Sequence, residues 1–278
     1  IIQTKKQTFG LIILVGIRIS YAPRLPKPGE TLHGTKFTTS FGGKGANQCV
    51  AATKLAISDL LRLFRTTGKY KDHFKATGVN VDHVYLTPNS TTGIAQISVA
   101  DNGENQIVIV PGANSHLSVK DVENSIDLMK NADVLIAQSE TPMETTLEAF
   151  KYNKGVSNCK VYLRIIGNVV LAIEKLLKYG CETVIITLGG DGAVYASKSD
   201  PRPVHVPCEQ VTPVDTTGAG DAFVGALAKY LMTEKFPLHQ IIGAACHIAT
   251  LSVTKEGTQT SYPSNVEAFN REYKYFYL

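Results

Sequence analysis

The sequence predicts an α/β domain in which a mostly parallel sheet is flanked by helices. From residue 119 onward, short apolar runs alternate with longer helical patterns, as they do when crossover helices cover parallel strands. Residues 94–109 differ, because apolar residues alternate with others around Asp101-Asn102-Gly103, which is typical of a β-hairpin. The 278 residues are 44% hydrophobic, which is enough for one large core.

The elements of the N-terminal half follow from apolar runs and glycine turns. We expect a buried strand over Leu11–Val15 and a more exposed strand over Leu32–Ser40. An apolar helical pattern runs from Ala46 to Leu61, and a second helix over Tyr70–Ala76 ends near Gly78.

The C-terminal half is predicted to alternate between helices and strands. The expected elements are helix 119–129, strand 134–137, helix 142–151, strand 160–163, helix 170–178, strand 183–187, a hairpin around Val194 and Val204, and helices 219–230, 238–254 and 266–273.

The bulk composition excludes several classes of function. A net charge of +4 is too small to indicate nucleic-acid binding. The apolar run Phe9–Ile17 is too short to span a bilayer, and we expect no membrane partner. Five cysteines without paired spacing indicate free thiols in a reducing compartment, so the cytoplasm is expected, with the nucleus as an alternative.

A glycine-rich turn over Val214–Phe223 carries the strongest indication of chemistry. A strand-like run ends at Val214, and an apolar helical run begins just after Gly220. Backbone N–H groups at such a helix start form an anion site, because they lack intrahelical partners. Asp221 lies where a phosphate and a sugar hydroxyl could meet. The alternative is a strand-to-helix turn with an aspartate cap and no catalytic role.

Other phosphate-binding motifs are absent from the sequence. No GxxxxGK[ST] motif occurs, and Gly218-Ala219-Gly220 lacks the third glycine of a dinucleotide-binding fingerprint. The protein-kinase motifs are absent as well. The remaining possibility is a phosphoryl transfer supported mainly by positioning and charge stabilisation.

Six segments together resemble the motifs of the ribokinase-like (PfkB) carbohydrate kinases and follow the order of that family. They are Arg24–Thr31, Phe41–Gln48, Val110–Asn114, Thr187–Gly192, Val214–Phe223 and Gly257–Gln259. The resemblance implies a ribokinase-like fold over residues 1–278, with a small β-sheet lid from about 20–41 and 83–112. It also implies ATP-dependent phosphorylation of the primary hydroxyl of D-ribose to ribose 5-phosphate, with Mg²⁺ and an activating K⁺ as cofactors.

The resemblance assigns the catalytic roles to the turn before the last apolar helices. Asp221 is expected to accept the proton of the sugar hydroxyl as that oxygen attacks the γ-phosphate. Gly218 and the N–H groups of Ala219, Gly220 and Asp221 are expected to form an anion hole, in which one donor stabilises the transition state by ~3–4 kcal/mol.

Sugar binding is assigned to a second glycine turn and to one carboxylate after a strand. The expected sugar-binding residues are Gly42, Gly43, Lys44, Gly45, Ala46, Asn47, Glu140 and Asp221. Lys44 and Asn47 could donate to sugar hydroxyls. Glu140 follows a strand at its carboxyl end, where α/β sheets bind their ligands.

The resemblance further implies a nucleotide site and a cation site. The expected ATP-binding residues are Thr187, Leu188, Gly189, Gly190, Asp191, Gly192, Gly220, Asp221 and Cys246. The expected K⁺ ligands, several of them through main-chain oxygens, are Asp215, Thr217, Ser252, Lys255, Gly257 and Ser261.

The sequence departs from the family pattern at three places. The sugar-binding aspartate after the first strand is missing, because Gly16 is followed by Ile17-Arg18-Ile19-Ser20. A Gly-Asp turn between Leu55 and Tyr70 is also absent. After Lys160 the chain lacks one αβ unit and the Asn-x-x-Glu motif that organises Mg²⁺ in the family.

Three alternatives remain open after these departures. The chain is an active ribose kinase, a degenerate or truncated protein that binds ligands with little catalysis, or a kinase for another sugar or nucleoside. The lid hairpin also offers an apolar face that relatives use for dimers, and the resemblance therefore implies a homodimer as a further hypothesis.

Overall fold

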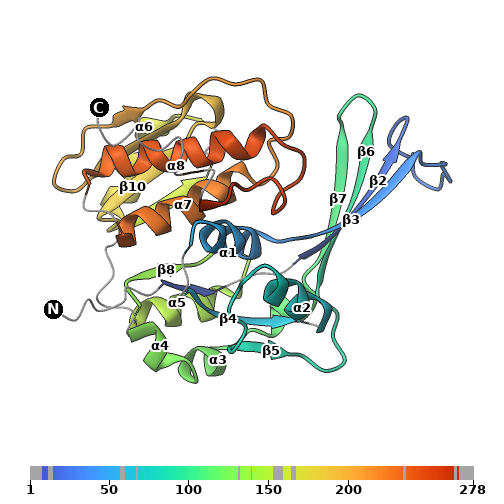
Figure 1. The fold of residues 1–278 in the computed structure, drawn as a ribbon, viewed down its shortest axis with the longest axis horizontal. Helices are drawn as coiled ribbons and strands as arrows, with labels where there is room; N and C mark the ends of the chain where they lie inside the picture. Colours follow the sequence, from blue (N-terminus) through green and yellow to red (C-terminus); the bar gives the residue numbers. More distant parts are fainter. Residues whose placement is uncertain are drawn as a thin grey trace.

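The computed structural model describes residues 8–11, 15–56, 60–66, 68–130, 132–138, 140–152, 159–163, 167–233, 236–265 and 268 (Figure 1). These residues form three four-stranded sheets. Two of the sheets belong to the body of the molecule, and the third projects from its side as an arm (Figure 1). Within the described residues, no helix has both the length and the apolarity that a membrane span needs.

The first body sheet is parallel and has the order β5-β4-β1-β8. Its strands are β1 (Thr8–Leu11), β4 (Leu60–Thr66), β5 (Val84–Leu86) and β8 (Val134–Ile136). Helix α1 (Lys44–Lys54) packs on β1 and β4. The sheet therefore supports the helix that begins in the predicted sugar-binding turn.

Two predictions in this region were wrong. Leu61 was expected in the first helix, but it lies in β4 and pairs with Phe9. The helix ends at Lys54 because Ala56 adopts a positive φ of 64°, which interrupts helical geometry. Val84 was expected at the edge of the lid, but β5 pairs with β4 and extends the body sheet. Sheet pairing overrode the local helical pattern at Leu61.

The expected first strand over Leu11–Val15 is also corrected by the structure. Strand β1 ends at Leu11, and β2 (Val15–Ala22) begins at Val15 in a different sheet. Residues 12–14 lie outside the described residues. One apolar run therefore contributes to both the body and the projecting arm.

The second body sheet has the order β12-β11-β10-β9. Its strands are β9 (Cys159–Leu163), β10 (Thr183–Thr187), β11 (Ala193–Ser197) and β12 (Val204–Val206). Val184 and Ile186 pack with Ile173 of α6 (Val169–Lys178), whereas Ile185 belongs to the core on the opposite face. Burial on both faces explains the unbroken apolar run of β10.

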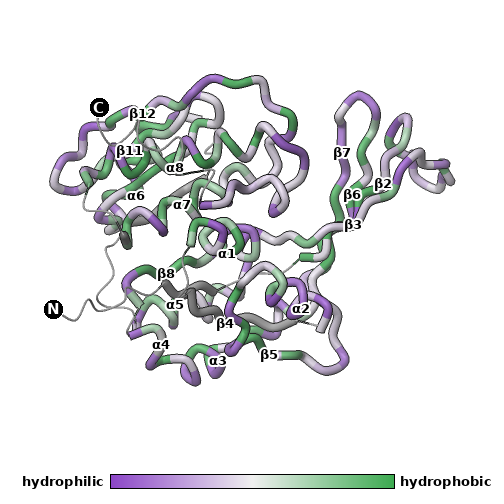
Figure 2. Tube along the Cα trace, viewed as in Figure 1, coloured by the Kyte–Doolittle hydropathy of each residue, from purple (hydrophilic) through white to green (hydrophobic). Residues whose placement is uncertain are grey.

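Helices α7 (Ala219–Thr233) and α8 (Leu238–Val253) pack against each other, and α7 also packs on α1. One core cluster contains residues of both body sheets, including Val84 and Ile185, together with α1, α7 and α8. Hydrophobic stretches run along the second sheet and the helices that cover it (Figure 2). These three helices therefore join the two body sheets.

The two body sheets are separated at the strands β8 and β9. Within the described residues, these strands share no sheet pairing, so each is an edge strand. The separation falls in the region where the sequence lacks one αβ unit of the family. On α5 (Met143–Tyr152), between these strands in the chain, Met143, Leu147 and Phe150 are 61%, 54% and 46% exposed. Exposed apolar side chains of this kind are what the loss of a covering αβ unit leaves behind.

The projecting sheet, called the lid here, has the order β3-β2-β6-β7. It consists of β2, β3 (Lys36–Gly42), β6 (Gly93–Ala100) and β7 (Asn105–Val110). The predicted hairpin around Asp101-Asn102-Gly103 is confirmed, since β6 and β7 pair as antiparallel neighbours. The sheet begins at Val15 rather than at residue 20, and its second part begins at Gly93.

The remaining elements follow the expected order with small changes at their ends. They are α2 (Gly68–Ala76), a 3₁₀ helix (Gly112–His116), α3 (Val119–Glu123), α4 (Ile126–Lys130) and a second 3₁₀ helix (Gly189–Asp191). The single helix expected over 119–129 is thus divided into α3 and α4. The helix expected over 266–273 falls on residues that, apart from Ala268, lie outside the described ones.

Gly225 fixes the contact between α7 and α1. A Cβ atom at this position would lie 2.7 Å from both the Ala51 Cβ and the Gln48 backbone oxygen. We expect Gly225→Ala to lower the free energy of unfolding by about 1–3 kcal/mol, because backbone atoms cannot yield like a flexible side chain. Urea denaturation measures this change. Gly68→Ala is the matched control, because no atom lies within 4 Å of its Cβ position; equal effects of the two substitutions would contradict the prediction.

Candidate active site

Asp221 lies in the first turn of α7 and is 7% exposed. Its two carboxylate oxygens accept from two neighbouring amides of α1. Asn47 Nδ2 donates to Oδ2 at 2.9 Å, and Gln48 Nε2 donates to Oδ1 at 2.9 Å. The structure therefore joins the two glycine motifs of the sequence, which are far apart along the chain.

The turn before α7 is shaped by Gly218, whose φ is +80°. A Cβ atom there would lie 2.6 Å from the Tyr262 hydroxyl and 3.0 Å from the Thr258 side chain. The Tyr262 hydroxyl donates to the Gly218 carbonyl at 3.2 Å. Only glycine combines the left-handed backbone with this close approach.

The first turn of α7 presents backbone donors beside Asp221. The Ala222 N–H donates to the Gly218 carbonyl at 2.9 Å, so the N–H groups of Gly220 and Asp221 precede this bond and have no intrahelical acceptor. The Ala219 N–H donates to the Thr216 carbonyl at 3.3 Å. Of the three predicted anion-hole donors, Ala219 is thus already engaged by the turn.

Burial and the polar neighbours of Asp221 have opposite effects on its pKa. Burial is the largest influence and raises the pKa of Asp221 to about 6, while the amides of Asn47 and Gln48 favour the ionised form. Lys44 lowers this pKa as well, and Glu140 raises it. The result is a carboxylate that is ionised at neutral pH and more basic than an ordinary aspartate, which suits a general base.

The sugar-binding turn predicted over Gly42–Asn47 leads from β3 into α1. Gly43 has φ +96° and ψ 131°, and its carbonyl accepts from the Asn47 N–H at 2.9 Å. The buried Tyr70 hydroxyl donates to the Gly42 carbonyl. Gly45 and Ala46 are buried in the first turn of α1, so the turn is held from α2 and from its own helix.

Lys44 and Glu140 form an ion pair beside Asp221. Their side chains are 56% and 37% exposed, so both remain accessible from solvent. The structure therefore brings together the predicted base, the predicted sugar turn and the predicted sugar-binding carboxylate.

The predicted nucleotide loop, Thr187–Gly192, follows β10 in the second body sheet. The Leu188 N–H donates to the Gly192 carbonyl at 2.7 Å, and Gly192 has φ +88°. The carbonyl of Gly190 accepts from Gln210 Nε2 at 2.6 Å and from Cys208 Sγ at 2.9 Å. No atom lies within 4 Å of a Cβ position at Gly189 or Gly190, which leaves open space over the loop.

Cys246, the residue predicted beside the adenine, is 5% exposed in α8. Burial raises the pKa of its thiol to about 12, so the side chain is neutral and apolar. Cys208 is close enough to contribute to the same increase. Cys246 and the loop over residues 189–190 are therefore linked through Cys208.

The predicted K⁺ ligands lie in two adjacent segments. Asp215 Oδ1 accepts from the Thr217 N–H and Oδ2 accepts from the Gly257 N–H, each at 2.9 Å. Burial by itself would raise the pKa of Asp215, but hydrogen bonds from Thr217 and Gly257 lower it below its usual value. Residues 214–217 and 252–261 thus form one loop pair around an ionised carboxylate.

The three remaining predicted ligands lie on the second of these segments. Ser252 and Ser261 are both 1% exposed, and their hydroxyls donate to the carbonyls of Ala249 and Thr258. Lys255 is exposed, and only its main-chain oxygen suits a cation. An ionised carboxylate with carbonyl and hydroxyl oxygens fits a hard cation such as K⁺.

The described residues do not supply a comparable site for Mg²⁺. Among them, no group of three or more His, Cys, Asp or Glu residues could hold a metal ion. Asn168 instead caps α6, since its side chain accepts from the Leu171 N–H at 3.1 Å. The missing Asn-x-x-Glu motif is therefore not replaced by these residues.

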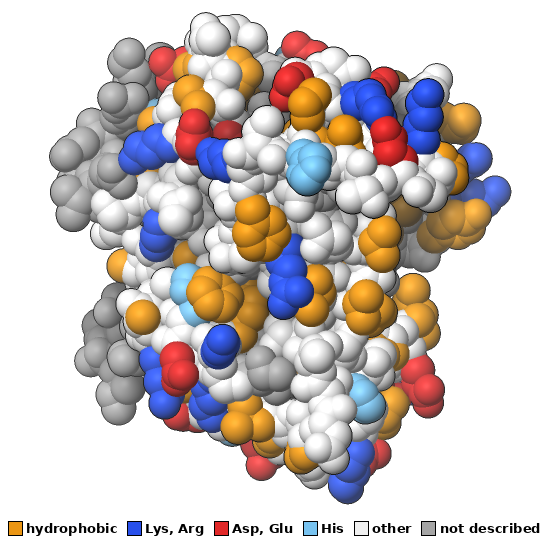
Figure 3. Space-filling model, turned by 90° about the vertical axis from the view of Figure 1, so that its right-hand side faces the viewer, with side chains coloured by type: hydrophobic (Ala, Val, Ile, Leu, Met, Phe, Trp, Pro, Cys, Tyr) orange, Lys and Arg blue, Asp and Glu red, His pale blue; other side chains and the backbone are white. Residues whose placement is uncertain are grey.

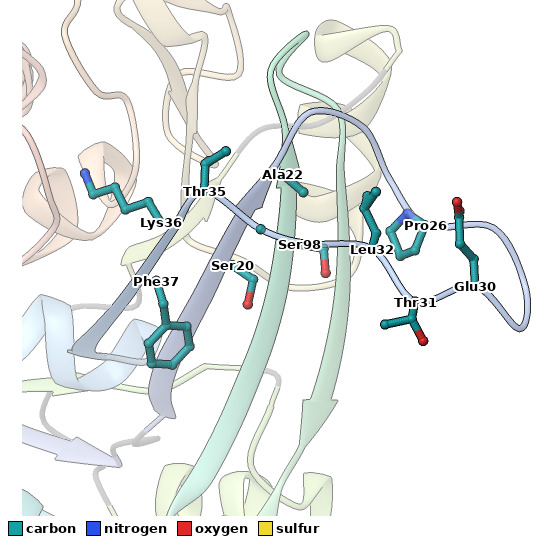
Figure 4. A pocket seen from close by; sticks show the side chains of 11 residues that line it. Ser20, Ala22, Pro26, Glu30, Thr31, Leu32, Thr35, Lys36, Phe37 and Ser98 are labelled. Carbon is teal, nitrogen blue, oxygen red and sulfur yellow. The ribbon is translucent and has the colours of Figure 1, made fainter.

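A hollow of about 590 Å³ lies in the lid (Figure 4). It is lined by β2, β3, β6 and the loop before β3, with Ser20, Leu32 and Phe37 among its side chains. Asn47 and Gln48, the residues that donate to Asp221, do not line this hollow. The candidate active site is therefore the polar cluster around Asp221, and this hollow is separate from it.

The model for "pfkB family carbohydrate kinase" matches residues 8–165 and 164–265. The chain belongs to the pfkB family of carbohydrate kinases. The chain is thus a phosphotransferase, and the arrangement of Asp221 with the Gly42–Asn47 turn is its candidate site. The break between the two matched stretches falls between β9 and α6, where the sequence lacks an αβ unit.

Individual relatives of this pfkB chain are sugar kinases. The ribokinase of Mus musculus is 35% identical over 88% of this chain and 88% of its own length, and the deoxyribokinase of Salmonella typhi is 32% identical over 91% and 94%. The mouse alignment has 284 positions, but it includes only 88% of the 278 residues of this chain. The mouse protein therefore carries residues within the aligned region that have no counterpart in this chain.

The fold is shared with solved members of the family. The structure of Arabidopsis thaliana ribokinase complexed with ribose and ATP superimposes with a TM-score of 0.87 at 23% identity, covering 99% of this chain and all of that one. At this level of identity the similarity establishes the ribokinase-like fold.

Sequence analysis missed three polar residues of the candidate site. Gln48 and Gln259 occur in the quoted motifs but were given no role, and Gln138 was not singled out. Gln138 Nε2 donates to Gln48 Oε1 at 2.9 Å, and Gln259 Nε2 donates to Asn47 Oδ1 at 3.0 Å. For Gln138 the only available indication was its place at the end of a predicted strand.

The protonation of Asp221 predicts an acid limb in the pH profile. Its pKa of about 6 lies above the ordinary value of 3.8, so the carboxylate gains a proton as the pH falls through 6. We expect kcat/KM for the sugar to be constant from about pH 7 to 8 and to fall tenfold per pH unit below about pH 6. Initial rates measured from pH 4.5 to 8.5 test this. A limb centred near pH 4 would contradict the raised pKa.

Proposed function

We propose that this pfkB kinase transfers the γ-phosphoryl group of ATP to the primary hydroxyl of D-ribose, giving ribose 5-phosphate and ADP. The observation that carries this proposal is the buried Asp221 carboxylate, which is held by α1 immediately after the glycine turn. The sugar assignment is supported by the ribokinase named among the relatives and by the ribose and ATP in the related complex.

Asp221 is the general base in the proposed mechanism. The carboxylate removes the proton of the primary hydroxyl while that oxygen forms its bond to the γ-phosphorus of ATP. The bond from phosphorus to the ADP oxygen breaks, and the charge leaves with ADP. A base with a pKa near 6 is ionised at neutral pH, yet it accepts a proton more readily than an exposed aspartate.

The sugar is oriented by the residues that surround this base. Lys44 donates to ring hydroxyls and Glu140 accepts from them, so a bound sugar replaces the ion pair that these two side chains form with each other. Asn47 and the backbone of the Gly42–Gly45 turn contribute further polar contacts. Such fixed contacts lower the entropic barrier, because the hydroxyl is presented directly to Asp221.

The phosphate side of the site is built from backbone groups. The N–H groups of Gly220 and Asp221 stabilise the charge that develops on the transferred group, at the positive end of the α7 dipole. The Thr187–Gly192 loop and Cys246 hold the nucleotide. K⁺ bound by the Asp215 and Gly257 segments would supply positive charge beside this helix start. Mg²⁺ would arrive bound to ATP.

A second candidate is a protein that binds sugar and nucleotide without turnover. Two observations favour it: residues 17–20, directly after Gly16, include no aspartate, and no described cluster replaces the Mg²⁺ motif. The αβ unit that is missing with the Mg²⁺ motif also accounts for the separation of β8 from β9. Turnover distinguishes the two functions, because both predict binding.

Substitution of the base tests the kinase proposal. We expect Asp221→Asn to lower kcat by about 10²–10⁴-fold, because general-base catalysis is lost while the amide keeps the shape of the side chain. Ribose-dependent ADP release with MgATP and K⁺ measures kcat, and calorimetry measures ribose binding. The control is Asp200→Asn, which removes an exposed ion pair with Arg202 and should leave kcat unchanged.

The same assay decides between the candidate functions and sugars. Ribose binding without detectable ADP release from the unmodified protein would overturn the kinase proposal in favour of ligand binding. A far higher kcat/KM for 2-deoxyribose than for ribose would overturn the sugar assignment.

We further propose that two chains associate through their lids. Every residue of β7 is exposed, and Ile107 and Ile109 are 52% and 64% exposed on one face of this strand. Apolar side chains lie among charged ones on the face from which the lid projects (Figure 3).

The cysteines described, Cys49, Cys181, Cys208 and Cys246, are free thiols and suit a reducing compartment such as the cytoplasm.

Charge on the lid tests the proposed dimer. We expect Ile107→Asp with Ile109→Asp to convert a dimer into a monomer, because the carboxylates would lose their water in the interface. Sedimentation velocity at micromolar concentration measures the mass. A monomeric mass of the unmodified chain would contradict the proposal. Glu104→Gln, an exposed residue beside the strand, is the control.

A further inference from the structure

Four buried carboxamides form two branches that end on Asp221. In one branch, Gln138 donates to Gln48, which donates to Oδ1 of Asp221. In the other, Gln259 donates to Asn47, which donates to Oδ2. All five residues are between 3% and 8% exposed. The branches therefore lie out of water, where an unpaired amide is costly.

The charge on Asp221 fixes the direction of every hydrogen bond in these branches. An ionised carboxylate only accepts, so Asn47 and Gln48 must turn their NH₂ groups toward it. Their carbonyl oxygens then point away and require donors, and Gln259 and Gln138 supply these donors at 3.0 Å and 2.9 Å. If either outer glutamine offered no donor, the inner amide could rotate and present its oxygen to Asp221.

Gln259 is itself held by other parts of the fold. Gln259 Oε1 lies 2.7 Å from His73 Nε2, so the direction of the branch makes this nitrogen the donor. The His73 ring stacks on Phe41 with centroids 4.0 Å apart. Lys54 of α1 donates to the Gln259 carbonyl at 2.8 Å. The branch through Gln48 begins at Gln138, two residues after the end of β8, where the Gln138 carbonyl accepts from the Thr141 hydroxyl at 3.2 Å. Among the described residues, Gln138 Oε1 has no hydrogen-bond partner.

We propose that Gln138 and Gln259 are positioning residues of the phosphoryl transfer: each donates to one α1 amide and thereby keeps both amides donating to Asp221. They act through Gln48 and Asn47 and do not touch the substrate. The inference deepens the proposed function, since it rests on Asp221 as the base.

Other charged and titratable groups around Asp221 contribute to its protonation. Lys44 favours the ionised form and Glu140 opposes it, and the Tyr262 hydroxyl lies close enough to interact with the carboxylate. Gln138 and Gln259 are uncharged, so their replacement by methionine leaves this set of charges as it is. An effect of such a substitution on protonation therefore reports the lost donor.

The test uses Gln138→Met and Gln259→Met in the full chain. Each variant is expected to raise the pKa of Asp221 by about one pH unit, because a hydrogen bond to a charged group is weakened or reversed. The acid limb of kcat/KM moves upward by the same amount, so activity lost at pH 6.5 is recovered at pH 8.5. The KM for ribose at pH 8.5 stays within about twofold.

A direct measurement separates this inference from the proposed function. The ¹³C carboxyl resonances of labelled aspartates, with Asp221 assigned by its loss in Asp221→Asn, report protonation even if the chain turns over no sugar. The control is Gln240→Met in α8, a glutamine outside both branches, which should shift neither the resonance titration nor the acid limb.

Two outcomes would overturn the inference. One is an Asp221 titration in both methionine variants within about 0.2 pH units of the unmodified chain. The other is a loss of activity that high pH does not restore, which indicates structural damage alone. If Gln138→Met does not fold, Gln138→Leu removes the donor with a smaller uncharged side chain. We expect the same upward shift from this variant, and an unchanged titration would again reject the proposal.

Discussion

The Asp221 carboxylate, buried between two amides of α1, is the interaction on which the rest of the site depends. A charge at this depth is stable only if donors surround it, and Asn47 and Gln48 are those donors. They occupy the first turns of a helix that starts in the sugar-binding turn. The position of the proposed base is therefore tied to the position of the predicted sugar-binding turn, through one contact between α1 and α7.

That contact also explains how the fold tolerates a divided central sheet. Strands β8 and β9 do not pair among the described residues, yet a single core cluster includes both body sheets. The cluster is continuous because α1, α7 and α8 pack on one another across the division. The part of the molecule that holds Asp221 is thus built from helix packing and does not depend on the missing strand.

The two halves of the site differ in completeness. Asp221, Lys44 and Glu140 meet on the sugar side, and the Asp215 loop pair offers oxygen ligands for a monovalent cation. On the metal side, no described carboxylate cluster takes the place of the family motif. The divided family match and the divided sheet fall in one region, so the three observations describe one structural change.

By itself the sequence determined the family, the order of most helices and strands, and the turn that contains Asp221. These features are local, because glycines with positive φ and alternating apolar residues leave direct traces in the chain. Only the tertiary structure decided that Leu61 belongs to a strand and that Gln138 lies behind the base. Sheet pairing overrode the local pattern in the first case. In the second, a glutamine at the end of a strand acquires its role only from Gln48, 90 positions away in the chain.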